Sequence, residues 1–416
     1  MTEEKKSMVP KLRFPEFTET WEQRKLEELA SKFTGGGTPN TSNPNYWNGE
    51  IPWIQSSDLK EDDVLSLTVK KHISQEGLKN SATKIVPKNS LVIVTRVGVG
   101  KLVVNTQEIA TSQDFLSLSG IKGDSRFLAY SLYSLLKKIT RRVQGTSIKG
   151  ITKTDFLKET ILVPALEEQE KISSCMVEVD KLITLHQRKL DVLNKLKKYL
   201  LQKMFPENGQ LIPELRFPAF SGAWEQRKLS EIVRMNARIG WQNLRQSEFL
   251  DDGDFLLITG TDFKNGRVNF GTCHYIAKER FDQDPKIQVE EGSILLTKDG
   301  TIGKVALVDK LSKPATLNAG VYNIVPKNRV VESRFLFQYL SAPFLLDYVN
   351  KAATGGTIKH LNQSILVDFP VSFPSVAEQE KIGKFLEGID HVTTLHQRKL
   401  EGLRKLKKSL LQQMFV

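Results

Sequence analysis

Cysteine is scarce in this sequence, which has only Cys175 and Cys273 among its 416 residues. The two lie far apart along the chain, so we expect neither a disulfide framework nor a cysteine-rich zinc site. No stretch approaches the roughly 18 consecutive apolar residues that a membrane span requires. The charged N-terminus Met1–Lys6 has no apolar signal core behind it. We therefore expect a soluble protein of a reducing cytoplasm.

Motifs for catalysis are missing as well. The turns that end in Lys101 and Lys304 are not P-loops, because the first glycine of G-x-x-x-x-G-K-[ST] is absent and apolar residues replace the hydroxyl residue. The Asn-Pro-Pro or Asp-Pro-Pro motif with which amino-methyltransferases hold a flipped base does not occur. The six histidines show no metal-ligand spacing. Acidic clusters such as Glu61–Asp63 lie in loop-like surroundings, and spacing alone leaves a nuclease-type carboxylate pair open as a minor alternative.

Positive charge is in excess. The chain carries 60 Lys and Arg against 48 Asp and Glu, which gives a formal net charge of +12 and a pI of about 9.4. This balance favours a polyanionic partner, with nucleic acid ahead of a membrane surface. The alternative is that the charge only keeps the protein soluble.

The chain is internally duplicated. Residues 21–26 (Trp-Glu-Gln-Arg-Lys-Leu) recur unchanged 203 positions later, and residues 185–190 (Leu-His-Gln-Arg-Lys-Leu) recur unchanged 210 positions later. Glu168–Ile172 also recurs unchanged in the second half, and Pro10–Phe17 and Leu200–Phe205 have near copies there. Two identical six-residue words in the same order are not a chance repeat, so we expect two copies of one structural unit.

Between these words only a skeleton is shared. Asn89–Lys101 aligns with Gly292–Lys304, and both predict a short apolar strand that leads into a glycine-containing turn and a lysine. Phe127–Ile139 and Phe335–Val349 each show the periodicity of an amphipathic helix. The frame is repeated while most of its polar side chains differ, which is expected of two recognition modules with one fold and different targets.

A long helix is predicted at the end of each half. Over residues 166–204 apolar side chains recur mostly at steps of three or four, without an interrupting proline or glycine. The second copy contains Gly383, Gly388 and Gly402, so it should be the less stable helix alone. Each helix would span about 60 Å at about 1.5 Å per residue. A narrow apolar stripe needs a partner, and the economical partner is the other copy, packed antiparallel. The first stripe consists of Ile172, Met176, Val179, Ile183, Leu190, Leu193, Leu196, Leu200 and Met204.

Base recognition is expected where matched loops of the two halves carry different polar side chains. Arg and Lys suit guanine and Asn and Gln suit adenine in the major groove, while backbone amides, hydroxyls and lysines hold phosphates. The similar loops 145–149 and 355–359 favour phosphate binding. Taken singly, each glycine is better explained by a tight turn, and Trp21 and Trp224 by packing. The candidate contact residues are Gly36, Thr38, Asn40, Thr95, Arg96, Lys101, Gln113, Thr146, Ser147, Lys149, Arg238, Gln242, Asn243, Arg245, Lys298, Asp299, Thr301, Lys304, Asn318, Thr357 and Lys359. Among them, the pairs Gln113-Asp114 and Asn318-Ala319 are expected to occupy equivalent places.

Together these features resemble the specificity subunit of bacterial type I restriction–modification systems. The resemblance covers nearly the whole chain and rests on the repeated Trp-Glu-Gln-Arg-Lys-Leu words, the Gly-Lys turns, the two Thr-Ser-Ile-Lys-like loops and the Glu-Gln-Glu-Lys-Ile helices. It implies two target recognition domains, each contacting half of a split DNA site. It also implies two antiparallel helices that set the gap between the halves and dock two methyltransferase subunits, which restriction/translocase subunits join. The first helix lacks the short tandem insert that tunes spacer length in some relatives, so the gap is not predicted.

We therefore predict an α+β fold with an internal pseudo-two-fold repeat, in which two β-rich target recognition domains are joined by two long antiparallel helices that form a coiled coil. The predicted segments are target recognition domain 1 (1–162), spacer helix 1 (163–205), a linker (206–212), target recognition domain 2 (213–372) and spacer helix 2 (373–416). The predicted function is sequence-specific binding of double-stranded DNA, without catalytic residues, a metal or a membrane partner. S-adenosylmethionine, ATP and Mg²⁺ are expected on partner subunits.

Two alternatives from other classes stay open. The chain would be a duplicated coiled-coil scaffold if its lobes bound protein and its basic helices bound nucleic acid without sequence preference. It would be a self-sufficient methyltransferase or nuclease if the isolated chain turned over DNA.

Overall fold

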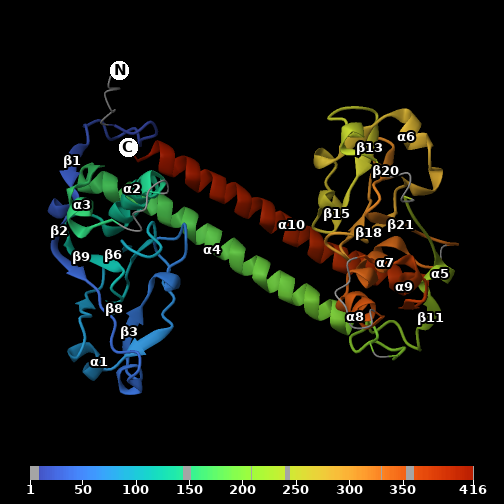
Figure 1. Ribbon diagram of the computed structural model, residues 1–416, viewed down its shortest axis with the longest axis horizontal. Coiled ribbons are helices and arrows are strands. Elements are labelled where there is room, and N and C mark those ends of the chain that lie inside the picture. The colour runs from blue at the N-terminus through green and yellow to red at the C-terminus, as the bar shows by residue number, and fades with distance from the viewer. Residues whose placement is uncertain are drawn as a thin grey trace. The chain divides into compact units, whose positions relative to one another are not determined.

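The computed structural model describes residues 9–143, 151–207, 209–238, 244–328, 330–352 and 360–415 (Figure 1). The chain divides into two compact units, which are treated one at a time below. Unit 1 comprises Met1–His186 and Lys399–Val416, and unit 2 comprises Gln187–Arg398. Each unit therefore contains the beginning of one long helix and the end of another.

Unit 1 combines two four-stranded sheets, a two-stranded ribbon and helices. The sheets have the strand orders β2-β9-β6-β7 and β4-β3-β8-β5, and the ribbon pairs β1 with β10. The strands are β1 (Glu22–Lys25), β2 (Ala30–Gly35), β3 (Ile51–Ile54), β4 (Lys71–Ile73), β5 (Ile85–Val86), β6 (Leu91–Val94), β7 (Leu102–Val104), β8 (Ile109–Thr111), β9 (Phe115–Ile121) and β10 (Thr160–Val163). The helices are α1 (Gln75–Lys79), α2 (Ser125–Val143), α3 (Lys153–Lys158) and α4 (Leu166–Lys203), which continues into unit 2.

Unit 2 repeats this plan with a larger sheet. Its sheets have the orders β12-β21-β18-β19-β15-β14 and β16-β13-β20-β17, and β11 pairs with β22. The strands are β11 (Glu225–Lys228), β12 (Val233–Ala237), β13 (Phe255–Ile258), β14 (Phe263–Lys264), β15 (Arg267–Val268), β16 (His274–Ile276), β17 (Gln288–Val289), β18 (Ile294–Thr297), β19 (Val305–Leu307), β20 (Ala315–Leu317), β21 (Val321–Pro326) and β22 (Pro370–Phe373). The helices are α5 (Leu229–Ile232), α6 (Lys278–Asp282), α7 (Ser333–Leu340), α8 (Pro343–Ala352), α9 (Gln363–Val367) and α10 (Val376–Gln413), which continues into unit 1.

The central strand of each unit lies between two hydrophobic cores. Leu91 and Ile93 of β6 face the core that contains α2 and the start of α4, while Val92 and Val94 face the core shared with the second sheet. Successive side chains of a strand point to opposite faces, and here both faces are covered, so every position of β6 is apolar. In unit 2, β18 is divided between two cores in the same way.

The repeated words form the same contacts in both units. The word Glu-Gln-Arg-Lys forms β1 and β11, whose first residues pair with Val163 and Phe373 respectively. Arg13 binds Glu168 through two hydrogen bonds of 2.7 and 2.8 Å, and Arg216 binds Glu378 with the same two distances. Both carboxylates are 1% exposed, so each forked pair ties the start of a half to the start of its long helix. The predicted α+β pseudo-repeat is confirmed.

One expected helix is interrupted. Phe127–Ile139 lies within the single helix α2, as predicted, but the segment Phe335–Val349 is divided between α7 and α8. The break falls immediately before Pro343, which has no backbone N–H and whose ring disfavours helical geometry in the preceding residue. The prediction of one continuous amphipathic helix was wrong at this point.

The long helices run antiparallel in each unit. In unit 1, Ile172 and Met176 of α4 pack in one core with Met414 and Phe415, which follow α10, and Asp180 pairs with Lys407. Residues further along α4 thus contact residues nearer the start of α10, as expected of antiparallel helices. In unit 2 the same order holds, because Lys197 pairs with Asp390 while Leu200 and Met204 pack with Leu386 and Ile382.

Both long helices contain 38 residues without interruption. The predicted stripe was wrong at Leu196, which is 42% exposed. The neighbouring Lys197 side chain is 21% exposed and points toward the other helix in place of Leu196. The reason is that the apolar face of a straight helix gradually rotates away from a strict seven-residue repeat. The predicted five-segment domain division stays a prediction.

Candidate nucleic-acid interface

Three turns of unit 1 meet at one edge of its second sheet. Strands β3 and β8 are parallel, so the residues that follow them lie together. The Ser112 amide donates to the Ile54 carbonyl at 2.9 Å, and the Thr95 amide donates to the Asp114 carbonyl at 2.9 Å. The turns after β3, β6 and β8, far apart in the sequence, therefore form one continuous surface.

The glycine-rich loop after β2 joins this surface. The Gly37 amide donates to the Thr111 carbonyl at 2.8 Å, and the Thr38 hydroxyl binds the side chain of Gln113. A Cβ at Gly36 would overlap the carbonyl oxygen of Ser112. Glycine is required here because two backbone segments approach closely. The structure thus brings the predicted residues Gly36, Thr38 and Gln113 together.

The turn between β6 and β7 presents two cations. Arg96 is exposed and Lys101 is half-buried, and neither side chain forms a hydrogen bond or ion pair within the part of the chain that the structure describes. Gly98 and Gly100 have φ angles of +87° and +110°, which favour glycine. Thr95 is only 7% exposed and its hydroxyl donates to the Asp114 carbonyl at 3.3 Å. Thr95 therefore positions the turn, while the two cations are available to an anionic ligand.

The equivalent edge of unit 2 has the same backbone frame. The Lys298 amide donates to the Gly320 carbonyl at 2.9 Å, and the Asn318 amide donates to the Ile258 carbonyl at 2.9 Å. These bonds match those of Thr95 and Ser112 in unit 1. Asn318 therefore occupies the place of Ser112, and the predicted match with Gln113 was wrong by one residue. The loop between β19 and β20 is three residues longer than the loop between β7 and β8, and an alignment made from short words does not locate such an insertion.

Two of the candidate contact residues in unit 2, Lys298 and Asp299, interact with neighbouring side chains. The imidazole Nδ1 of His360 lies 2.6 Å from Oδ1 of Asp299, and the Lys298 ammonium lies 5.5 Å from the centre of the Tyr322 ring. Thr301 and Lys304 are exposed. Where unit 1 has the cation Arg96, unit 2 has the anion Asp299. The two edges thus share a frame and differ in charge.

Arg238 contradicts its predicted role. Its side chain lies inside unit 2 and is 2% exposed. Its Nε donates to the Leu317 carbonyl at 2.9 Å, and burial lowers the pKa of its guanidinium. Arg238 thus holds the core near the recognition edge and cannot contact DNA in this conformation. No local pattern predicts this burial, because the residue directly follows a strand in a segment expected to be a loop.

Asn40 and Arg245 are exposed. The side-chain oxygen of Asn40 accepts a hydrogen bond of 3.0 Å from the Ser42 amide, and the Arg245 amide donates to Glu248 at 2.7 Å. Seven candidates lie outside the described residues and stay predictions: Thr146, Ser147, Lys149, Gln242, Asn243, Thr357 and Lys359.

Sequence reasoning missed other residues at this edge. A Cβ at Gly98 would lie 3.8 Å from the Cβ of Ser56, which places the turn after β3 beside the turn after β6. Trp47, Lys70 and Lys71 line a cavity close by. Their signal in the sequence is weak, because Trp47 lies 23 positions before Lys70 and the Lys-Lys-His run has no copy in the second half.

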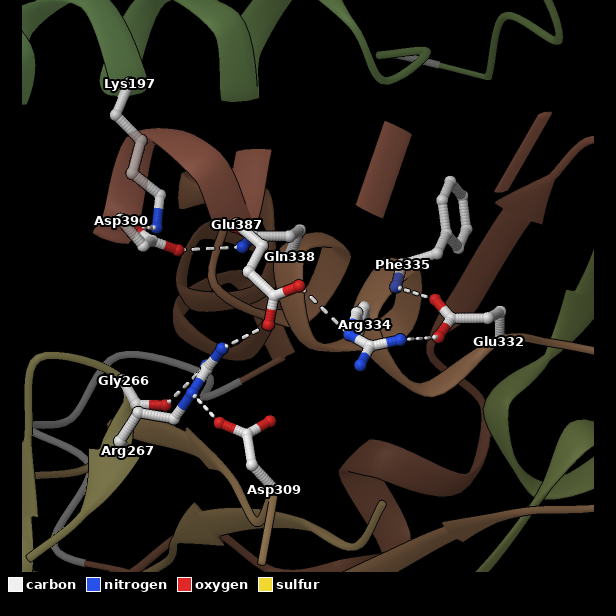
Figure 2. Close-up of polar contacts among 10 residues, drawn as sticks. All are labelled: Lys197, Gly266, Arg267, Asp309, Glu332, Arg334, Phe335, Gln338, Glu387 and Asp390. Carbon is white, nitrogen blue, oxygen red and sulfur yellow. Dashed lines mark hydrogen bonds and ion pairs between the residues drawn. The ribbon is translucent and has the colours of Figure 1, made fainter. Parts of the chain in front are cut away.

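Unit 2 is tied to its helices by a charged network (Figure 2). Arg267 of β15 binds Asp309 at 2.5 Å and Glu387 of α10 at 2.8 Å. Arg334 of α7 binds the other oxygen of Glu387 at 3.0 Å. Figure 2 shows a second group beside it, in which Gln338 donates to Asp390 at 2.8 Å and Lys197 pairs with the same carboxylate. The bonds of Arg267 fix the six-stranded sheet, whose strand β18 leads into the turn of Lys298, to α10.

Among the described residues, no helix carries an apolar stretch of the length needed to span a bilayer. Within the same residues, no three His, Cys, Asp or Glu side chains are grouped so that they could hold a metal ion.

Comparison with known proteins identifies the fold. The model of the type I restriction modification DNA specificity domain matches residues 18–195 and 222–405. The chain is 23% identical over 409 residues to the type I restriction enzyme MjaVIII specificity subunit of Methanocaldococcus jannaschii, covering 96% of this chain and 92% of that protein. The crystal structure of a type I restriction–modification S subunit from M. genitalium has a TM-score of 0.67 at 17% identity and covers 98% of this chain and 99% of that one.

A further solved structure, described as the basis of complex assembly and conformational transition of the type I restriction–modification system, has a TM-score of 0.52 at 16% identity and covers 94% of this chain and 96% of that one. The structural likenesses show a shared fold over almost the whole chain. Because the family model matches both halves, the protein belongs to the type I restriction–modification DNA specificity family and is a DNA-binding specificity subunit with two such domains.

Proposed function

We propose that each unit recognises one half of a bipartite target in double-stranded DNA. The observation that supports this most strongly is the pair of equivalent edges, which share backbone hydrogen bonds and differ in side chains. A common frame positions each edge against the same kind of ligand. Different side chains on that frame would select different base sequences.

The candidates that are exposed or half-buried divide by chemistry. Arg96, Lys101 and Lys304 suit phosphate oxygens, which would set the register of the duplex. Gln113 and Asn318 offer amide groups of the kind that pair with adenine in the major groove. We propose that these groups act together with the loops at 146–149 and 357–359, whose similarity between the halves suits phosphate binding.

The long helices would set the spacing and dock two methyltransferase subunits. Leu185 is 46% exposed, and its copy Leu395 is 42% exposed. Both belong to the word Leu-His-Gln-Arg-Lys-Leu, which is unchanged between the helices. Identical words that begin with an exposed leucine, one on each long helix, would provide two equivalent sites for two copies of the same partner.

The partners would supply the chemistry. As a member of this family the chain is a recognition subunit and not itself an enzyme. We propose that methyltransferase subunits bind S-adenosylmethionine and that restriction/translocase subunits bind ATP and Mg²⁺. The complex would work in the cytoplasm, where it meets the DNA.

A domain exchange tests the assignment of half-sites. Residues 30–160 are replaced by the corresponding lobe of another family member, and the chain is assembled with its methyltransferase. Single-molecule mapping of methylated DNA should show a new sequence in one half of the target and the old sequence in the other. A change in both halves would contradict independent recognition.

Salt dependence separates this proposal from a non-specific scaffold. Binding to target and non-target duplexes is measured with the assembled chain from low to high salt. A sequence-specific component should persist at high salt, whereas a scaffold would lose all binding with the phosphate contacts. Insertion of one helical turn near Asn194 tests the helices as a ruler, since the tolerated spacer should lengthen. An unchanged spacer would show that the length of the helices does not set the distance between the half-sites.

A further inference from the structure

A cavity of about 600 Å³ opens on unit 1 beside the glycine-rich loop. Trp47, Lys70, Lys71 and His72 line it, together with loop residues at 41 and 48–49. The two lysines and the histidine are exposed, and Trp47 is half-buried. None of these residues belongs to the turns described above. The cavity therefore offers cations and an aromatic ring to a ligand outside the recognition edge.

The aromatic wall of the cavity is Trp47, which packs against the buried Trp53. Trp47 and Trp53 meet edge to face, with ring centres 4.9 Å apart and an interplanar angle of 89°. The Trp53 indole donates to the Gly37 carbonyl at 3.0 Å, and the Trp47 indole donates to the Asn40 carbonyl at 3.1 Å. Both indole N–H groups are thus used to hold the glycine-rich loop.

The cations lie on the same side as the recognition turns. Strand β4 is antiparallel to β3, with Lys71 opposite Trp53, so β4 begins where β3 ends. Lys70 lies 3.6 Å from the buried carboxylate of Asp58, in the turn after β3. The Lys71 ammonium lies 5.6 and 5.7 Å from the centres of the two indole rings. Lys70 is therefore partly neutralised, and Lys71 is the cation held against the aromatic wall.

We propose that this cavity, which we call the flank pocket, holds the sugar–phosphate backbone of duplex DNA next to the half-site that unit 1 contacts. The proposal rests on the DNA-recognition function above. Ammonium and imidazole groups bind the phosphate oxygens of the backbone. An open pocket that adjoins the glycine-rich loop is placed to receive backbone that continues beyond the contacted bases.

The lysine pair of the flank pocket has no counterpart at the matching positions of the described part of unit 2. In the register of the second sheet, His274 lies opposite Leu257 as Lys71 lies opposite Trp53. The preceding residue, at the place of Lys70, is Cys273, which is 9% exposed. We therefore expect the protected DNA to extend further on the side of unit 1 than on the side of unit 2.

The test compares two duplexes bound by the full chain with its methyltransferase. One duplex continues beyond the unit 1 half-site, and the other is trimmed at its edge. Lys71→Gln and the double variant with Lys70→Gln should weaken binding to the long duplex several-fold and lower the salt slope by about 0.9 per lost phosphate contact. Binding to the trimmed duplex should not change. Lys79→Gln on α1, an exposed lysine that does not line the pocket, is the control.

The outcomes are distinguishable. Equal losses on both duplexes, or none on either, would overturn the flank pocket. Tighter binding of a single-stranded flank than of a duplex flank would instead assign the pocket to an unpaired base. Wild-type chain that fails to discriminate target from non-target DNA on either duplex would refute the proposed function itself. Hydroxyl-radical footprints of the wild type and of Lys71→Gln give an independent measure, because the one-sided extension should disappear only in the variant.

Discussion

Lys407 and Asp180 form a buried ion pair, with Nζ 2.6 Å from Oδ1 and side chains that are 8% and 11% exposed. The Tyr130 hydroxyl donates to the other oxygen of Asp180 at 2.7 Å, and Lys407 also donates to the Asp62 carbonyl at 2.6 Å. Burial raises the pKa of Asp180 in spite of its cationic partner. The carboxylate thus depends on these partners to stay ionised.

The same pair occurs in unit 2 with the helices exchanged. Lys197 of α4 is the counterpart of Lys407, 210 positions earlier, and Asp390 of α10 is the counterpart of Asp180, 210 positions later. Gln338 replaces Tyr130 as the third partner. The unit 2 pair is more exposed, at 21% and 18%. The pseudo-two-fold repeat therefore extends to individual charges between the antiparallel helices.

Lys407→Ala should destabilise the protein by about 3 kcal/mol or more, because it leaves a buried carboxylate without its cation. Lys197→Ala should cost less, since the Asp390 carboxylate is more accessible to water. The free energy of unfolding in urea measures both effects, and Lys408→Ala, at an exposed neighbouring position, is the control. Equal losses for Lys407→Ala and Lys408→Ala would show that the pair does not stabilise the helix contact.

Gly36→Ala should impair DNA recognition by unit 1. The added Cβ would overlap the Ser112 carbonyl, and the displaced loop should cost about 2 kcal/mol of binding free energy. Discrimination at the half-site of unit 2 should be retained. Gly35→Ala is the matched control, because a Cβ there meets nothing within 4 Å. Wild-type affinity of Gly36→Ala in a fluorescence anisotropy titration would refute the close packing of this loop as a requirement for binding.

Arg238 and Arg96 should respond differently to substitution. Arg238→Ala should lower the free energy of unfolding by about 1–3 kcal/mol, because the buried Leu317 carbonyl loses its donor. Arg96→Ala should leave stability unchanged and reduce the slope of log affinity against log salt by about 1, through the loss of one phosphate contact. The two measurements on both variants test the assignment, and it fails if Arg96→Ala unfolds more easily while its salt slope is unchanged.

The three glycines of α10 should differ in how their replacement by alanine changes stability. Gly388→Ala and Gly402→Ala should each stabilise the protein by about 0.5–1 kcal/mol, because a Cβ at either place meets nothing within 4 Å and alanine favours the helix. Gly383→Ala should gain less or destabilise, since its Cβ would lie 3.0 Å from the Cβ of Arg334 and 3.1 Å from the amide of Phe335. Thermal melts of the three variants measure the changes in stability. An equal gain at all three positions would contradict the expected difference between Gly383 and the other two.

The parts of this protein that the sequence predicted are those that depend on local pattern. Periodic apolar residues predicted the long helices, and the repeated words predicted the duplication. A short apolar run that leads into a glycine-containing turn predicted the strand before Lys101 and its copy before Lys304. Two predictions from periodicity were wrong. Pro343 divides a segment predicted to be one helix, and Lys197 points toward the other helix where Leu196 was expected.

Most of the recognition surface could not be predicted, because it is made by contacts between turns distant in sequence. The parallel pairing of β3 with β8 brings Ser112 to the turn after β3, and the glycine-rich loop closes on both. Arg238 and Arg96 are the same residue type next to strands, yet one is buried and the other exposed. That difference depends on which chain segments cover a side chain, which no local pattern contains.

The sequence alone determined that there are two copies of one unit, each followed by a long helix, because duplication and periodicity are properties of the chain itself. The tertiary structure alone decided which side chains each copy presents, and it paired Asp180 with Lys407 and Lys197 with Asp390. The physical reason is that burial and charge pairing depend on distances in space, and these are set only when the strands pair and the helices pack.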